Sequence, residues 1–203
     1  MRDPLLQTLG HRYRLWRTPR TAVRDLADGA VVKVVGRARS IGEPILAPFT
    51  GRALVALRAM GMRVEGSGRS RRVHVLDDVE KGQQFLVEDD TGVARVDLAG
   101  FSRLFAPTLR AGRGAADHVE RYFARYGQHE RTFFDGFAGD VYYFERGVEE
   151  GAEVAVLGLA RATGDLAPAS ARGGYREAPR LFAIEPPASD RVLVSEEPGH
   201  RRR

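Results

Sequence analysis

The residues best suited to chemistry form one cluster of histidines and carboxylates, which are His118, Glu120, His129, Glu130 and Asp135. A metal site on a helix needs ligands on one face, as two histidines four residues apart provide. His118 and Glu120 lie only two residues apart and point in different directions on a helix. We interpret the cluster as a solvated helix end, with a metal or acid–base site as the alternative, and predict no metal and no cofactor.

Two acidic runs could supply paired carboxylates for acid–base chemistry, at Asp77-Asp78 and at residues 88–90. Aspartates next to a glycine are typical of turns, where the carboxylate accepts hydrogen bonds from the local backbone. The chain has no cysteine, which excludes disulfides, thiolate zinc sites and cysteine nucleophiles. Neither a serine nucleophile elbow nor a glycine-rich phosphate loop with a lysine is present. We therefore predict that the chain is not an enzyme.

A basic patch beside a glycine-rich loop is the first candidate for binding a partner. It comprises Arg69, Arg71, Arg72 and His74. Alternate residues of a strand share a face, so Arg72 and His74 could together contact an anionic ligand or an acidic protein surface. The alternative is a strand edge that charge protects from aggregation. The net charge of +5 agrees with an acidic partner, but only Lys33 and Lys81 are lysines, and a GC-rich coding bias gives the same excess of arginine.

Residues 1–21 read as a basic, amphipathic lead-in. Apolar residues recur there at helical spacing, namely Leu5, Leu9, Tyr13 and Trp16, although Gly10 weakens the helix. Our first interpretation is a helix that packs its leucines and Trp16 on the domain. The alternative is a segment that lies on an anionic membrane. The candidate membrane contacts are then Arg12, Arg14, Trp16 and Arg17.

Two distant stretches are nearly the same. Residues 28–40 read DGAVVKVVGRARS and residues 150–162 read EGAEVAVLGLARA. Each has an acidic-Gly turn, alternating valines and a glycine where a curved strand bends. We expect both copies in one closed sheet, about a rough two-fold that brings Val34 and Val156 into one core.

The segment 84–98 predicts a β-hairpin whose turn contains Gly92. Its inward residues are Phe85, Val87, Ala94, Val96 and Leu98, and its outward residues are Leu86, Glu88, Val93, Arg95 and Asp97. We expect a helical insertion over residues 101–139, on the helical spacing of Val119, Tyr122, Phe123 and Tyr126. Glu145, after an aromatic run, is interpreted as a carboxylate that caps the turn before Gly151.

The order of a V-x-V-x-G strand and an F-x-x-x-D-x-T-G hairpin resembles the first strands of an OB-type barrel. These elements are Val32, Val34 and Gly36, followed by Phe85, Asp89, Thr91 and Gly92. OB-type barrels that bind nucleic acid stack bases on aromatic rings. The outward hairpin face here has no aromatic residue and two carboxylates, which argues against that use.

Across residues 22–195 the pattern is similar to the GIDE domain of the MULAN family, membrane-anchored E3 ubiquitin ligases of mitochondria with prokaryotic relatives. The resemblance is carried by Gly36, a Pro44/Pro48/Gly51 segment, the hairpin, and a run from Glu145 to Gly158. It implies a domain that recognises proteins or ligands beside a membrane. The ligases also have membrane helices and a cysteine-rich RING finger, which this chain lacks, so their ubiquitin-transfer activity is not implied.

We therefore expect a mainly β (α+β) protein with an OB-like, closed or partly open barrel. Residues 22–197 would form one domain, and residues 198–203 a frayed basic tail. The predicted function is non-enzymatic recognition of a protein or small ligand, with nucleic-acid binding as the alternative. Since no stretch is apolar enough to span a membrane and no signal peptide is evident, we expect a cytoplasmic protein that could contact a membrane peripherally.

Overall fold

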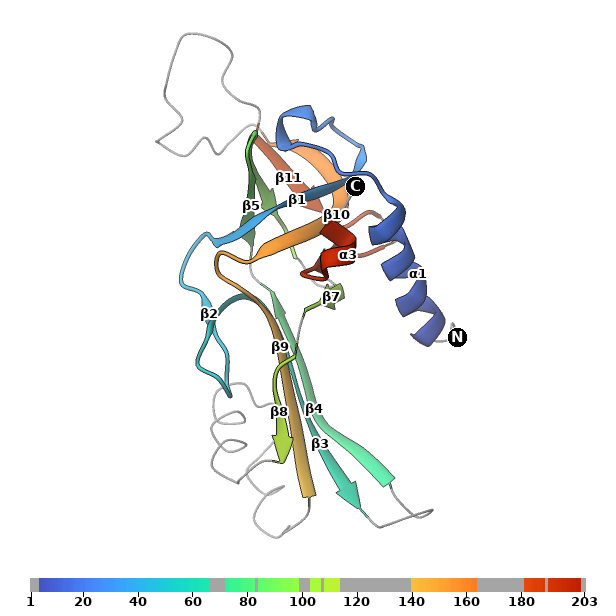
Figure 1. Ribbon diagram of the computed structural model, residues 1–203, viewed down its shortest axis with the longest axis vertical. Helices are drawn as coiled ribbons and strands as arrows, with labels where there is room; N and C mark the ends of the chain where they lie inside the picture. The colour runs from blue at the N-terminus through green and yellow to red at the C-terminus, as the bar shows by residue number, and fades with distance from the viewer. Residues whose placement is uncertain are drawn as a thin grey trace.

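The chain forms a β-barrel from which a second, narrow sheet extends, as the computed structural model in Figure 1 shows. The structure describes residues 4–65, 72–82, 84–98, 103–106, 108–113, 140–163, 181–188 and 190–201. The helical elements are α1 (Pro4–Arg17), the 3-10 helix η1 (Val23–Asp25) and α3 (Pro198–Arg201). The barrel and its edge are built from β1 (Val31–Ser40), β5 (Phe85–Asp89), β6 (Gly92–Val96), β7 (Arg103–Phe105), β10 (Glu153–Thr163), β11 (Leu181–Glu185) and β12 (Leu193–Ser195). The second sheet is built from β2 (Ile45–Leu46), β3 (Ala53–Glu65), β4 (Arg72–Gly82), β8 (Thr108–Arg113) and β9 (Asp140–Glu149).

The barrel is closed and has five strands, in the order β1-β5-β6-β11-β10 and back to β1. Neighbouring strands are antiparallel except for β6 and β11, which are parallel. This is the order of the five-stranded Greek-key barrel of the OB type. The predicted mainly β, OB-like barrel is therefore confirmed.

The two repeated stretches are the strands that close the barrel. β1 and β10 are antiparallel, and Val34 lies opposite its repeat equivalent Val156. Val32 lies opposite Gly158, and Gly36 lies opposite Val154, so a local two-fold passes between Val34 and Val156. The turns before the strands obey the same symmetry. Gly29 N–H donates to Ala160 O and Gly151 N–H to Ala38 O, both at 2.8 Å. Both glycines have positive φ, +78° and +80°, which a side chain would oppose. The predicted pairing is confirmed.

The acidic residue before each glycine has the same task in both copies. Asp28 Oδ1 accepts the N–H of Ala162 at 2.9 Å, and Glu150 Oε2 accepts the N–H of Ser40 at 2.7 Å. Each carboxylate thus holds the end of the opposite repeat strand. The acidic-Gly signature is explained by strand closure and requires no ligand.

The two-fold extends to the neighbouring strands, which the sequence analysis did not detect. Phe85–Glu88 of β5 reads FLVE and lies against β1 as Phe182–Glu185, FAIE, of β11 lies against β10. The equivalent glycines explain the close approach. A Cβ at Gly36 would lie 2.3 Å from the carbonyl oxygen of Glu88, and one at Gly158 would lie 2.9 Å from that of Glu185.

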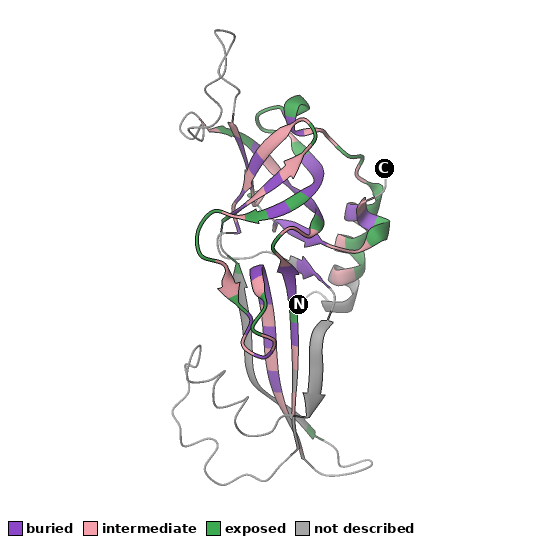
Figure 2. Ribbon diagram, turned by 60° about the vertical axis from the view of Figure 1, so that its left-hand side comes forward, coloured by how far each residue is buried: buried purple, intermediate pink, exposed green. Residues whose placement is uncertain are grey.

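The hairpin prediction is confirmed in detail. β5 and β6 pair from Phe85 opposite Val96 to Asp89 opposite Gly92. All five predicted inward residues are buried. They join the main core of the barrel, which also holds Val34, Val156 and Ile184. In Figure 2 the buried residues gather in the barrel and in the adjoining end of the second sheet.

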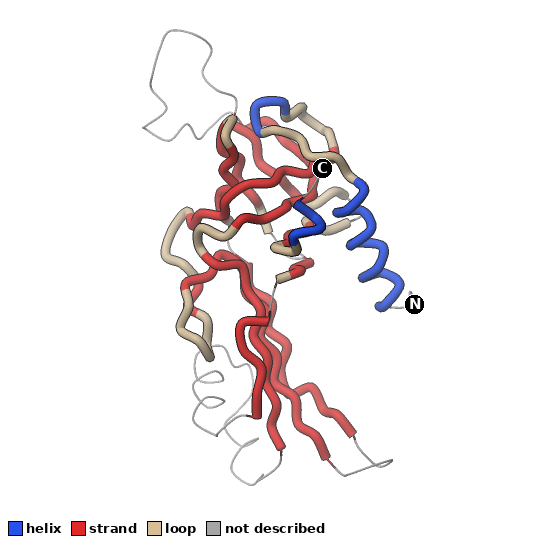
Figure 3. The backbone as a smooth tube through the Cα atoms, in the orientation of Figure 1, coloured by secondary structure: helices blue, strands red, loops and turns tan. Residues whose placement is uncertain are grey.

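The second sheet is assembled from two long connections of the barrel. The connection between β1 and β5 supplies β2, β3 and β4, and the connection between β6 and β10 supplies β8 and β9. β3 runs between β4 and β9 and pairs with both over most of its length. In Figure 3 these strands run together away from the barrel, while α1 and α3 lie along one side of it.

The expectation of a helical insertion over residues 101–139 needs correction where the structure describes this range. Residues 103–105 and 108–113 are strands, because β7 pairs with β12 and β8 pairs with β9. Pairing with a strand that is distant in sequence determines their conformation, so a local pattern could not reveal it. Residues 114–139, including the predicted helical face and the His/acid cluster, lie outside the described residues.

Glu145 of β9 is a fully buried carboxylate. Its Oε2 accepts the N–H of Phe49 at 2.8 Å, and its Oε1 accepts the hydroxyl of Thr50 at 2.6 Å. The predicted capping role is right in kind but wrong in place, because the turn lies between β2 and β3 and not before Gly151. Its hydrogen bonds offset the cost of burying the charge.

Candidate functional site

Helix α1 presents an apolar ridge to solvent. Leu9, Tyr13 and Trp16 follow one another at i, i+4 and i+7 and are 62%, 54% and 44% exposed. The rings of Tyr13 and Trp16 are in contact, with centroids 6.1 Å apart. We call these three residues the α1 ridge. In Figure 2 the helices beside the barrel carry exposed residues, in green.

Arg17 flanks the ridge. Its guanidinium lies over the Tyr13 ring, 5.9 Å from the centroid, and its Nη1 donates to the Tyr13 hydroxyl at 3.1 Å. A cation stacked on an aromatic ring keeps its charge available at the surface while its stem covers apolar area. The outward side of α1 therefore combines apolar area with a fixed positive charge.

From residue 8 onward, where the burial of α1 is described, Leu15 packs the helix against the barrel. Leu15 is fully buried and joins a small core with Val35 of β1, Leu157 of β10 and Phe105 of β7. The barrel interior covers one face of β1 and β10, and α1, β7 and β12 cover part of the other face. The interpretation that Leu9 and Trp16 pack on the domain is wrong, because α1 is rotated so that Leu15 faces the barrel.

A buried lysine fixes the end of the helix. Lys33 of β1 is fully buried, and its Nζ donates to the carbonyl oxygen of Leu15 at 3.0 Å. The last carbonyls of a helix lack partners within the helix and carry partial negative charge, so a cation there is stabilising. Lys33 thus secures the orientation that turns the ridge outward.

Ion pairs with the C-terminal segment complete the attachment of α1. Arg12 pairs with Glu197 at 2.5 Å, Arg14 pairs with Asp190, and His11 Nε2 lies 3.7 Å from Asp190. These partners are far away in sequence, so no local pattern could reveal them. Of the predicted membrane contacts, Arg12 and Arg14 serve this attachment, whereas Trp16 and Arg17 belong to the outward side.

The C-terminal segment is ordered against α1. The sequence predicts a frayed tail from residue 198, but Pro198–Arg201 form helix α3, and His200 is buried. Its Nδ1 lies 2.7 Å from Ser195 Oγ, which also accepts the N–H of Glu197 at 3.1 Å. Burial lowers the pKa of His200; the Glu197 carboxylate opposes this shift, and Arg12 and Lys33 add to it. Ser195 is fully buried, and its contact with His200 holds α3 against β12.

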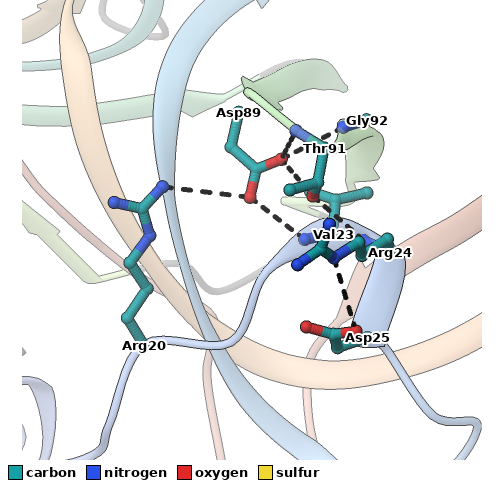
Figure 4. A network of polar contacts seen from close by, with 7 residues as sticks. All are labelled: Arg20, Val23, Arg24, Asp25, Asp89, Thr91 and Gly92. Carbon is teal, nitrogen blue, oxygen red and sulfur yellow. Dashed lines mark hydrogen bonds and ion pairs between the residues drawn. The ribbon is translucent and has the colours of Figure 1, made fainter.

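The D-x-T-G turn, which carries part of the family resemblance, has a structural task that Figure 4 shows. Asp89 accepts the N–H and hydroxyl of Thr91 at 2.8 and 2.6 Å, the N–H of Gly92 at 3.1 Å, and the N–H of Val23 at 3.0 Å. Arg20 lies 4.0 Å away. Burial would raise the pKa of Asp89, but these hydrogen bonds outweigh it and the pKa is lowered. The carboxylate attaches η1 to the barrel.

The outward face of the hairpin does not offer a strong site for nucleic acid. Glu88 is paired with Arg39 at 2.5 Å, and Asp97 accepts a long hydrogen bond of 3.4 Å from Gln84. Neither aromatic stacking nor a continuous basic groove is provided by the residues that face outward on β5 and β6.

The predicted basic patch is only partly described. Arg69 and Arg71 lie outside the described residues. Arg72 is exposed at the start of β4, opposite Glu65 of β3, and His74 follows two residues later on the same strand, opposite Arg63. The two residues therefore have the strand spacing that the prediction requires, and their role in binding stays a prediction.

Among the residues that the structure describes, no group of three or more histidines and carboxylates could hold a metal ion. Within the same residues, no helix is long and apolar enough to cross a membrane. Comparisons with models of known protein families, with curated proteins and with solved structures found no match.

Proposed function

We propose that this protein is a non-enzymatic recognition module that uses its OB-like barrel as a scaffold and the α1 ridge as its contact surface. The observation that carries the proposal is the orientation of α1. The helix is fixed by Leu15, Lys33 and ion pairs, and it turns three large apolar side chains to solvent. Exposing Tyr13 and Trp16 has no benefit for folding, whereas aromatic residues are the usual anchors of interfaces.

The attachment of α1 also suits recognition energetically. A disordered segment must be ordered when it binds, and that ordering weakens the affinity. Here the helix is already formed and docked, so a partner would gain the full burial of the ridge. The resemblance to the GIDE domain, a recognition domain in its family, supports the same proposal.

Capture by immobilised full-length protein tests the proposal. The ridge variant is Leu9→Ser/Trp16→Ser, and the matched control is Ile41→Ser/Leu46→Ser, which removes side chains of similar exposure, 50% and 41%. Leu46 belongs to β2 and Ile41 to the connection that precedes it, and Figure 1 shows β2 on the other side of the molecule from α1. Proteins, lipids and small molecules retained from an extract are compared by mass spectrometry. A ligand kept by the wild type and the control but lost from the ridge variant supports the proposal. Identical retention by all three proteins overturns it.

Two further measurements test the alternative contact surfaces, which are the predicted basic patch and a nucleic-acid-binding face. Loss of the ligand from Arg72→Gln/His74→Gln, with the ridge variant unaffected, would assign the contact to the predicted basic patch. Binding of single-stranded or duplex nucleic acid that falls steeply with salt and ignores the ridge substitutions would favour the nucleic-acid alternative.

A further inference from the structure

We infer that the α1 ridge docks on a membrane surface that carries anionic headgroups; the inference rests on the proposed function and names the partner of the same surface. α1 contains no aspartate or glutamate, whereas it contains three arginines. Its outward side joins Leu9, Tyr13 and Trp16 to the stacked Arg17. Tryptophan and tyrosine prefer the boundary between headgroups and acyl chains, and arginine extends from apolar surface to a phosphate.

The geometry of the ridge favours a membrane over a protein groove. Seven residues of helix span about 10 Å, so the ridge is a short line of three side chains on a helix that lies along the barrel. A stable protein interface needs about 800 Å² from each partner, so a protein partner would have to contact much more of the surface than these three side chains. A bilayer surface requires no matching groove, and an amphipathic helix lies in it with the apolar side down.

The distribution of charge on α1 agrees with this orientation. Arg14 points away from the ridge and is paired with Asp190. Arg17, 5.9 Å from the Tyr13 ring centroid, stands beside the apolar line at the level where headgroup phosphates would lie. Because only one short helix contributes, binding should be weak, reversible and sensitive to salt.

The experiment measures co-sedimentation of the full-length protein with phosphatidylcholine vesicles, with and without phosphatidylglycerol. We expect clear binding to the anionic vesicles, weaker binding to the neutral ones, and a decrease with added salt. Arg17→Gln should lower the partition coefficient about fivefold, the equivalent of roughly 1 kcal/mol for one cation near an anionic surface. Leu9→Ser should lower it by a similar factor, because a largely exposed leucine would be buried in the interface.

Matched controls are Arg52→Gln and Leu46→Ser. Arg52 is 52% exposed and ion-paired with Glu149, and its carbonyl oxygen accepts the N–H of Ala47, directly after β2. Leu46 is 41% exposed and belongs to β2, which lies away from α1 in Figure 1. Each control should bind within about twofold of the wild type, an allowance for small nonspecific effects on exposed sites. Because all four side chains are exposed, unchanged thermal unfolding would show that the variants are folded.

The outcomes separate this inference from the proposed function. No preference for anionic vesicles, or equal losses in the ridge and control variants, overturns membrane docking. If the ridge variant still loses a captured protein in that case, the recognition proposal stands with a protein partner. If the ridge substitutions change neither vesicle binding nor capture, both proposals fail.

Discussion

The orientation of α1 predicts opposite effects for two leucines on the same helix. Leu15 is fully buried against Val35 and Leu157, whereas Leu9 is 62% exposed. Truncation of a buried leucine costs about 2–5 kcal/mol, through lost burial and the cavity that remains. We expect Leu15→Ala to lower the free energy of unfolding by about 3 kcal/mol, limited by the free energy that docks α1 on the barrel. Leu9→Ala should change it by less than about 0.5 kcal/mol, as surface substitutions usually do.

Urea denaturation followed by fluorescence and by circular dichroism measures both variants. Trp16 is the single tryptophan of the chain and lies on α1, so its fluorescence reports the helix, while circular dichroism reports the barrel. In Leu15→Ala the midpoint of the fluorescence transition should move to lower urea at least as far as the midpoint of the circular dichroism transition. Equal losses in the two variants, or a larger loss in Leu9→Ala, would refute the orientation of α1 on which the proposed contact surface depends.

Three further predictions concern the 3-10 helix η1, the C-terminal helix α3 and the barrel itself. Asp89→Ala should lower the free energy of unfolding by about 3 kcal/mol in a thermal melt, because the N–H of Val23 loses its acceptor together with three other donors. Since the pKa of Asp89 is lowered in the folded protein, the carboxylate stabilises the fold above its unfolded pKa near 4, and this stabilisation should disappear as the pH falls below that value. His200→Gln should flatten the stability profile below about pH 6.5, since a lowered histidine pKa makes the wild type lose stability as the pH falls through that region; an unchanged slope would contradict this. Gly36→Ala should destabilise the barrel by more than about 2 kcal/mol, because its Cβ would lie 2.3 Å from the carbonyl oxygen of Glu88; a neutral effect on Tm would show that β5 can move away.

The barrel could be predicted because its signals are local. Alternating apolar residues define the inward face of β1, β5, β6 and β10, and glycines mark the turns and the close approaches. The repeat even predicted the pairing partner, since Val34 lies opposite Val156. The similarity of FLVE and FAIE is too short to detect from sequence, and the pairing with β1 and β10 was needed to recognise it.

The sequence predicted the amphipathic helix of the candidate site but not its orientation, which depends on contacts with residues distant in sequence. The spacing of Leu9, Tyr13 and Trp16 indicated an amphipathic helix, but a helical stripe does not say whether it faces the core or solvent. That choice is made by Leu15 and by Lys33, a buried residue on another element. It is reinforced by carboxylates near the C-terminus, more than 170 residues away along the chain.

The wrong predictions for β8 and α3 have the same cause, because both elements depend on partners distant in sequence. β8 forms because the edge of β9 is available to it, and α3 forms because His200 is buried beside Ser195. Neither condition is visible in the residues of the segment itself. Local propensity predicts the conformation of such a segment only when contacts with distant partners do not override it.

Acrylamide quenching of Trp16 tests the central claim most directly, which is that α1 presents its ridge outward and uses it for contact. In the free protein we expect efficient quenching, because Trp16 is 44% exposed. In the presence of the bound partner, with phosphatidylglycerol-containing vesicles as the first choice, quenching should decrease clearly in the wild type and in Leu46→Ser. A tryptophan that is already shielded in the free protein, or one that stays equally accessible when the protein is bound, would contradict the account.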